Sequence, residues 1–270
     1  MILQILALVA GGYLLLVGLL ALFQRAMIYH PDPVRTTPDA AGLPEMVPVQ
    51  TISADGWLIT GWYAPAASPD QVTVVFYHGN SGSIAGRAGK ARALLDAGFG
   101  VLLVGYRGFG GNPGSPSEAG LVQDGRAALH WLIGRGMPHS RVVLYGESLG
   151  TGIAVRMATE LEDLAGVVLE APFTCLPDLA PPYLLPGLAR LLMVDRFDNR
   201  GRMAALTAPL LILHGEKDDV VPVAMGRALL GLAGSGEKEA LFLPSAGHND
   251  LWEQGGRTRV MEFLHERTQW

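Results

Sequence analysis

The sequence of 270 residues contains one cysteine, Cys175, so it can form no disulfide within the chain and no zinc site built from cysteines. Charged residues are also scarce, at 17%, and the formal net charge is −5. Proteins that bind nucleic acid neutralise its phosphates with clusters of lysine and arginine, and this sequence has no such cluster. We therefore expect no nucleic-acid partner. No internal repeat is present, and the length suits one large α/β domain.

The longest apolar run is Met1–Phe23, in which Gln4 is the main polar interruption. As a helix rising about 1.5 Å per residue, it would cross a bilayer core of about 30 Å. A cleaved signal peptide would show a basic segment before the run and a small-x-small site after it, and both are missing. We predict an uncleaved single-pass membrane anchor over residues 1–25. A signal peptide and a buried helix are the alternatives, and Arg25 and Arg35 are too few charges to decide the membrane side.

Residues 26–46 are interpreted as a proline-rich linker, and residues 47–270 as one domain in which strands and helices alternate. This alternation predicts an α/β fold with a mostly parallel central sheet flanked by helices, which would bind ligands at the carboxyl ends of its strands. An Asp-Gly turn predicts an antiparallel hairpin from Val47–Ile52 and Trp57–Ala64. The further predicted strands are Val72–His78, Val101–Tyr106, Arg141–Tyr145, Leu164–Glu170, Leu210–His214 and Ala240–Leu243, and the helices are Ser83–Ala97, Glu118–Ile133, Thr151–Ala158, Val223–Leu232 and Asp250–Arg267.

One predicted strand leads into a serine between two glycines, in the order Gly146-Glu147-Ser148-Leu149-Gly150. A helix-like segment follows, and in this setting a Cβ at either glycine would collide with the neighbouring strand or helix. The sharp turn would hold the hydroxyl at the edge of the sheet, at the N-terminus of a helix whose dipole favours negative charge. Ser148 is therefore the candidate nucleophile. A tight strand-to-helix turn without a catalytic role is the alternative interpretation.

A serine nucleophile needs a general base, and the base needs an acid that orients it. The predicted strand at 240–243 ends in a loop that contains His248, and we predict that this imidazole is the base. A loop histidine at the start of a helix is the alternative. His78 and His214 also end strands, but each precedes a glycine, so we interpret both as parts of structural turns.

The acid is expected in the loop after the strand Leu210–His214, because the chain order serine, aspartate, histidine suits this architecture. We choose Asp218 from the three carboxylates of this loop, with Glu216 and Asp219 as alternatives. All three could instead be solvated surface charges. Glu170, at the end of another strand, is a reserve acid. If the strands are parallel, these loops lie at the same edge of the sheet as the candidate nucleophile.

An acyl-transfer enzyme also needs two N–H groups that stabilise the oxyanion. One should be the backbone N–H of Leu149, which follows the nucleophile, and the other should come from the loop after the strand Val72–His78. Gly79 lets the backbone approach closely there, and we assign the second donor to the N–H of Asn80. A phosphate-binding loop would need a Gly-Lys-Ser/Thr sequence, which does not follow. We expect neither a metal nor an organic cofactor.

Six short motifs follow one another along the chain: Tyr77-His78-Gly79-Asn80, Tyr106-Arg107-Gly108-Phe109-Gly110, Gly146-Glu147-Ser148-Leu149-Gly150, Ala171-Pro172-Phe173-Thr174, His214-Gly215-Glu216-Lys217-Asp218 and Gly247-His248. Through these motifs the chain resembles the α/β-hydrolase superfamily, and within it the Bem46-like group of membrane-anchored serine hydrolases. The resemblance covers the chain from about Ile28 to its C-terminus. It implies the α/β-hydrolase fold and the triad, it favours Asp218 as the acid because that residue lies four positions after His214, and it supports the membrane anchor.

A leucine-rich segment at about 172–204 interrupts the alternation of strands and helices. In folds of this kind such an insertion resembles a small helical cap over the site, and an apolar cap suggests an acyl or other lipophilic group in the pocket. The residues that we assign to this pocket are Phe173, Leu176, Tyr183 and Leu184. The alternative is that the leucines only pack the cap onto the rest of the domain.

Together these features predict a membrane-anchored serine hydrolase that cleaves a small-molecule carboxylic ester through Ser148, His248 and Asp218. A thioesterase or a peptidase with the same triad is the alternative among enzymes. A binding or scaffold protein that kept the fold but lost the chemistry is the alternative from another class. The sequence leaves the acyl chain length and the oligomeric state open.

Overall fold

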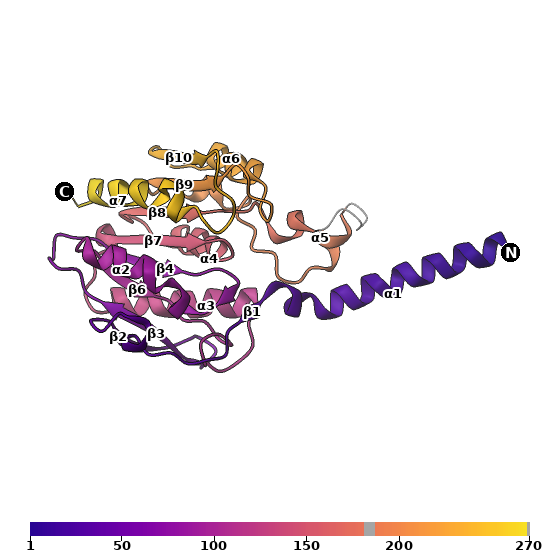
Figure 1. The fold of residues 1–270 in the computed structure, drawn as a ribbon, viewed down its shortest axis with the longest axis horizontal. Helices are drawn as coiled ribbons and strands as arrows, with labels where there is room; N and C mark the ends of the chain where they lie inside the picture. The colour runs from indigo at the N-terminus through magenta and orange to yellow at the C-terminus, as the bar shows by residue number, and fades with distance from the viewer. Residues whose placement is uncertain (181–186, 269–270) are drawn as a thin grey trace.

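The computed structural model describes residues 1–180 and 187–268, and an eight-stranded sheet lies at its centre (Figure 1). The strands lie in the order β10-β9-β8-β7-β4-β6-β3-β2. β3 pairs antiparallel with β2 and β6, and all other neighbours in this sheet are parallel. The predicted α/β fold with a mostly parallel sheet is thus confirmed. The bounds are β2 Val47–Ile52, β3 Leu58–Ala64, β4 Thr73–Tyr77, β6 Gly100–Leu103, β7 Val142–Glu147, β8 Gly166–Glu170, β9 Leu210–Gly215 and β10 Lys238–Leu243.

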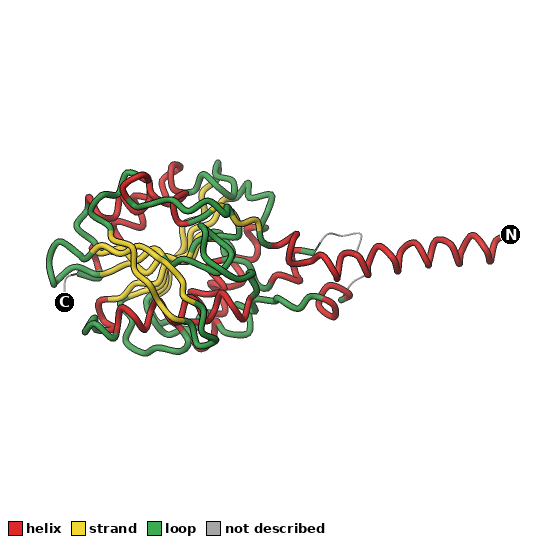
Figure 2. The backbone as a smooth tube through the Cα atoms, turned by 90° about the horizontal axis from the view of Figure 1, so that it is seen from below, coloured by secondary structure: helices red, strands yellow, loops and turns green. Residues whose placement is uncertain are grey.

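Helices cover both faces of this twisted sheet (Figure 2). Side chains alternate between the faces of a strand, so Val75 and Tyr77 of β4 join the core cluster beneath α3, α4 and α6. Val74 and Phe76 join the opposite cluster, beneath α2 and α7. Near-continuous apolar strands are therefore buried on both sides, as parallel sheets require. The helices are α2 Ala88–Asp96, α3 Glu118–Ile133, α4 Gly150–Ala158, α6 Val223–Leu232 and α7 Arg257–Glu266.

Some element boundaries differ from the predictions. α3 and α6 begin and end at the predicted residues, but the closing helix is shorter than the predicted Asp250–Arg267. A wide helical turn, Trp252–Gly256, precedes α7, and Gly255 within it has φ +119°, which regular α-helix cannot accommodate. The predicted helix Ser83–Ala97 likewise begins as a 3₁₀ turn, η2 Ile84–Arg87, before α2.

The N-terminal helix α1, Ile2–Ile28, projects away from the α/β domain (Figure 1). It is long and apolar enough to cross a membrane, which makes it a candidate span, and it continues three residues beyond the predicted anchor at 1–25. The predicted linker is also partly ordered. β1 His30–Pro31 pairs parallel with β5 Ser81–Gly82, because the chain leaving α1 runs along the loop that follows β4.

Between β8 and β9 the structure describes residues 171–180 and 187–209, and part of this segment lies beside the last turns of α1 (Figure 1). We call these described residues the cap, and they contain the 3₁₀ turns η4 Leu176–Leu179 and η5 Met203–Ala205 and the short helix α5 Leu188–Leu192. Tyr183 and Leu184, which the sequence analysis assigned to the substrate pocket, lie outside the described residues.

Polar contacts join the cap to α1. The Gln24 side chain donates to the carbonyl of Leu192 at 3.3 Å and accepts from the amide of Val194 at 2.8 Å. The buried carboxylate of Asp195 accepts from the Arg25 guanidinium and from the Tyr29 hydroxyl, each at 3.0 Å. The end of the helix is therefore held against the domain by side chains as well as by the chain itself.

Candidate active site

The serine turn between β7 and α4 has the steric form that its glycines predict. Ser148 has φ +50°, a strained conformation for a residue with a side chain. A Cβ on Gly146 would lie 2.6 Å from the Cα of Thr151, and one on Gly150 would lie 2.0 Å from the carbonyl oxygen of Tyr77. Both distances are impossible contacts, so only glycine fits at either position. The predicted collision of a Cβ with neighbouring elements is confirmed.

Three side chains from three loops form one hydrogen-bonded chain. His248, in the loop after β10, has its Nε2 3.0 Å from Oγ of Ser148. Its Nδ1 lies 2.7 Å from Oδ2 of Asp218, in the loop after β9. Because β7, β9 and β10 are parallel, their carboxyl ends bring these loops to one edge of the sheet. The structure thus brings together the three residues chosen from the sequence, at distances that permit proton transfer from serine to histidine.

The carboxylate of Asp218 is buried and held at both oxygens. Its Oδ1 accepts from the amides of Val220 and Val221, at 2.9 and 2.7 Å. Its Oδ2 lies 3.4 Å from Nε2 of His214 in addition to its bond with His248. Burial alone would raise the pKa of Asp218, but the hydrogen bonds from His214, His248 and the backbone outweigh it and lower the pKa well below its usual value. This aspartate therefore stays ionised beside the imidazole.

His214 has a larger part than the sequence analysis gave it. Its ring is fully buried at the end of β9, and Nε2 donates to the carbonyl of Val221 at 2.8 Å while facing Asp218. It therefore fixes the loop that carries the acid. The available signal was its position four residues before Asp218 at a strand end, but the sequence does not show that the loop folds back onto the ring.

The other carboxylates that were considered as the acid have different partners. Glu170 binds the ammonium of Lys90 at 2.7 Å and accepts from the hydroxyl of Tyr145. Glu216 pairs with Arg227 on the surface. Asp219 is exposed. His248 is hydrogen-bonded to Asp218 and to none of these three carboxylates.

A partly buried charge network lies beside the serine turn. Lys90 of α2 also binds Glu147, the neighbour of Ser148, at 2.8 Å, and Arg87 binds the other oxygen of Glu147 at 2.5 Å. Burial would raise the pKa of Glu147, but the two cations outweigh it and lower the pKa. The sequence did not reveal this network, because its members come from η2, α2, β7 and β8. It ties the helix to the two strands that position the serine.

Ser148 and His248 both face an open cleft of about 750 Å³ that the charge network also lines. This volume falls within the range of about 300–1,000 Å³ that is typical of small-molecule sites. The cleft is therefore large enough for a substrate to reach the hydroxyl. Among residues 1–180 and 187–268, no group of three histidine, cysteine or acidic side chains is placed to hold a metal ion.

The two backbone amides assigned to an oxyanion hole lie on segments that meet at the serine turn. Leu149 is the first residue after the serine and precedes α4, and the first amides of a helix have no acceptor within it. Asn80 follows Gly79, whose added Cβ would lie 3.5 Å from the carbonyl oxygen of Glu147. The loop therefore lies against the turn.

Asn80 is held by two bonds to the chain that leaves α1. Its carbonyl accepts from the amide of His30 at 2.8 Å, and its side-chain Nδ2 donates to the carbonyl of Ile28 at 2.7 Å. Neither bond uses the backbone N–H of Asn80. The pairing of β1 with β5 thus holds this residue and leaves its amide outside the ladder.

The remaining predicted pocket residues are separated in the structure. Phe173 is 1% exposed, and its side chain packs in the core cluster with Leu149 and Phe197. Leu176, by contrast, lines an apolar groove between the cap and α1. Phe173 lies three residues after the end of β8, where the chain is still buried, which explains the difference between the two positions.

A parallel sheet with an antiparallel hairpin at one edge, and a serine on a strained turn between β7 and α4, define an α/β hydrolase. A family model described as serine aminopeptidase, S33, matches residues 68–194. An uncharacterized protein of Mycobacterium tuberculosis is 36% identical over 98% of this chain and 94% of its own length. Protein bem46 of Schizosaccharomyces pombe is 31% identical over 80% of this chain and 73% of its own length. The chain belongs to the Bem46-like group of the α/β-hydrolase superfamily, as the sequence motifs predicted.

Two further comparisons involve named hydrolases. The mouse lysophosphatidylserine lipase ABHD12 is 30% identical to this chain. The match covers 70% of this chain and 53% of the lipase, so the chain spans about half the length of that relative. A solved esterase of Pyrococcus furiosus superimposes with a TM-score of 0.71 at 21% identity, over 88% of this chain and 97% of the esterase. At this identity the second comparison shows a shared fold.

Proposed function

We propose that this protein is a serine hydrolase that cleaves carboxylic esters and is anchored in a membrane by α1. The observation that carries the proposal is the continuous hydrogen-bonded chain from Ser148 through His248 to Asp218, at 3.0 and 2.7 Å. Such a chain activates a hydroxyl that is otherwise a weak nucleophile.

In the first half of the reaction, Oγ of Ser148 attacks the ester carbonyl and its proton passes to Nε2 of His248. The imidazolium is stabilised by Asp218, whose lowered pKa keeps it ionised. The C–O bond to the alcohol then breaks, and the leaving oxygen takes the proton from His248. The products of this half are a free alcohol and an acyl group on Ser148.

In the second half, a water molecule gives a proton to Nε2 of His248 and attacks the acyl carbon. The bond to Oγ breaks, Oγ recovers the proton, and a carboxylic acid leaves. In both halves, negative charge develops on the carbonyl oxygen, and the amides of Leu149 and Asn80 would donate to it. Losing one such donor typically costs about 3–4 kcal/mol of transition-state stabilisation.

The ester class is supported by the relatives that are named as a lipase and an esterase. The description of the matched family model as a serine aminopeptidase favours a peptidase as the second candidate, with a thioesterase as a further use of the same three residues. All of these share the acyl-enzyme. A scaffold without chemistry would not need the alignment of Ser148 with His248.

The test is hydrolysis of p-nitrophenyl butyrate by the full-length protein in detergent, alongside labelling by a fluorophosphonate probe. We expect Ser148→Ala to lose at least about 10³-fold in kcat and all labelling, because the nucleophile is removed. Ser245→Ala, a serine in the loop before His248, is the matched control and should change neither reading. Retained turnover in Ser148→Ala would contradict the assignment. Labelling without cleavage of esters, but with cleavage of aminoacyl amides, would favour the peptidase.

A further inference from the structure

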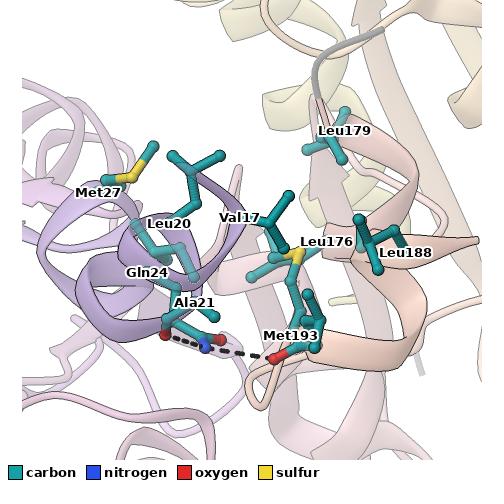
Figure 3. Close-up of a pocket in the computed structure, with 13 residues that line it drawn as sticks. Val17, Leu20, Ala21, Gln24, Met27, Leu176, Leu179, Leu188 and Met193 are labelled. Atoms are coloured by element: carbon teal, nitrogen blue, oxygen red, sulfur yellow. Dashed lines mark hydrogen bonds between the residues drawn. The ribbon is translucent and has the colours of Figure 1, made fainter. Parts of the chain in front are cut away.

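An apolar groove of about 270 Å³ lies between the last turns of α1 and the cap (Figure 3). One wall comes from α1 and the other from η4, α5 and the residues beside them. Figure 3 shows side chains of both walls pointing toward the space between them. The α1 wall consists of Val17, Leu20, Ala21, Gln24, Met27 and Ile28. The cap wall includes Leu176, Leu179, Leu188, Leu192 and Met193.

Both walls are fixed relative to each other. Gln24 is the one polar side chain of the α1 wall. Its amide hydrogen-bonds to the cap backbone at Leu192 and Val194, so both of its polar atoms have partners. Asp195 holds the end of α1 through Arg25. Hydrogen bonds therefore hold the two walls of the groove together, and its lining is apolar.

The groove runs along α1 in the direction of the membrane. Residues 2–28 as a helix measure about 40 Å, and a bilayer core is about 30 Å thick. If the apolar start of α1 fills that core, then Val17 and Leu20 lie near its boundary, with Arg25 in the headgroup region. Leu191 and Val194 of the cap are also 77% and 67% exposed, which places apolar side chains beside this part of the helix.

The other end of the groove lies near the loop after β4, which carries Asn80. Ile28 lines the groove, and its carbonyl is 2.7 Å from the side-chain amide of Asn80. Leu176 and Leu179 of the cap wall pack against the core cluster that contains Leu149, the residue after the nucleophile. One end of the groove thus lies next to the side chain of Asn80, and its cap wall packs on the core that also holds Leu149.

We propose that this groove binds the acyl chain of an ester lipid that enters from the bilayer, so that α1 is one wall of the substrate site as well as an anchor. The occupant is an acyl chain, because the lining is apolar on both walls and follows a helix that is long and apolar enough to cross a membrane. The polar cleft beside Ser148 and His248 then receives the headgroup alcohol. This inference rests on the proposed ester hydrolysis and names the class of ester.

The first experiment fills the groove from the α1 side. Ala21 lines it, whereas Ala26 is exposed on another side of the same helix. Full-length Ala21→Trp and Ala26→Trp proteins in detergent are compared with the unchanged protein on p-nitrophenyl acetate and p-nitrophenyl dodecanoate. The readout is the ratio of kcat/KM for the dodecanoate to kcat/KM for the acetate, so a general loss of folded protein cancels.

We expect Ala21→Trp to lower this ratio at least tenfold, because the indole occupies the space of the long chain, and Ala26→Trp to leave it unchanged. A ratio that stays the same in Ala21→Trp, or that falls equally in both variants, would overturn the proposal.

The second experiment does not need turnover and so separates this inference from the proposed function. The Ser148→Ala protein, in phosphatidylcholine vesicles, is irradiated with a monoacylglycerol whose palmitoyl chain carries a diazirine, and the labelled peptides are identified by mass spectrometry. We expect label on the cap peptide 187–193, lost when Ala21→Trp is added and kept when Ala26→Trp is added. Label confined to α1, as contact with bulk lipid would give, would overturn the groove even if Ser148 proves to be the nucleophile.

Discussion

At the scale of single residues, burial strongly lowers the pKa of His78, a histidine near the serine turn. His78, at the end of β4, is fully buried against the rings of Tyr106 and Phe109, and its Nδ1 donates to the carbonyl of Gly79 at 2.8 Å. Burial lowers its pKa to about 3, so the ring is neutral at neutral pH. Its position before the oxyanion loop is structural, in agreement with the interpretation of this residue as part of a turn.

This neutral histidine makes stability depend on pH. An unfolded histidine has a pKa of about 6.5, so between about pH 6.5 and 3 the unfolded state binds a proton that the folded state does not. The stability is therefore complete above pH 6.5 and falls as the pH is lowered through this window. At pH 5 the loss from His78 alone is about 2 kcal/mol.

We expect His78→Phe to lower the difference in unfolding free energy between pH 7 and pH 5 by about 2 kcal/mol, because phenylalanine keeps the ring packing and does not titrate. The measurement is urea unfolding followed by tryptophan fluorescence at the two pH values. The exposed His130→Phe serves as the control and should leave the difference unchanged. An equal pH dependence in His78→Phe and the unchanged protein would show that the buried ring is not the source.

At the scale of elements, the pairing of β1 with β5 joins the chain after α1 to the loop after β4, which carries Asn80. Only two residues of each strand pair, so Asn80 supplies a large share of the connection through its carbonyl and its side chain. A loop held at these two points keeps its backbone amide in place before the substrate arrives. Preorganisation of this kind is what makes an oxyanion hole effective.

Asn80→Ala keeps the backbone N–H but removes the bond to Ile28, so we expect kcat for p-nitrophenyl butyrate to fall about tenfold with little change in KM, equivalent to about 1.4 kcal/mol of transition-state stabilisation. Steady-state kinetics in detergent provide the measurement. Ser81→Ala, the next residue along and exposed, is the matched control. A variant with unchanged kcat would mean that the side chain does not position the loop.

At the scale of the whole molecule, α1 projects from the α/β domain (Figure 1). Most of the helix surface is exposed and apolar, and such a surface is stable only in lipid, in detergent or against another apolar partner. The cap residues that line the groove face the last turns of the helix. The exposed apolar surface therefore makes α1 a candidate membrane span.

We expect the full-length chain to stay in the membrane fraction after extraction with alkaline carbonate, with an intact mass that includes residues 1–25. Leu8→Lys combined with Leu15→Lys should release it, because each lysine near the centre of a span costs about 2.5–3.5 kcal/mol on insertion. The corresponding double alanine variant is the control and should remain bound. Recovery of a soluble chain that begins after residue 25 would show instead that the segment is a cleaved signal peptide.

Local patterns in the sequence predicted much of this molecule. The apolar strands, the Asp-Gly hairpin and the two glycines around Ser148 act through short-range sterics and burial, so their outcome can be read from neighbouring residues. His248 and Asp218 could be chosen because parallel strands bring all their carboxyl ends to one edge of the sheet, and this does not depend on the conformation of the loops.

Other features were decided only by tertiary structure. The contact of Gln24 with Leu192 joins residues 168 positions apart, and Lys90 reaches Glu170 over 80 positions, and no local pattern specifies such pairs. The same is true of the groove, which exists only because the cap folds onto α1. It is also true of His214, which holds the loop of Asp218 only because that loop folds back onto its ring. The sequence by itself determined the elements, the family and the candidate catalytic residues, because these depend on short-range order. Packing alone decided what surrounds them, because distant contacts form only when the whole chain has collapsed.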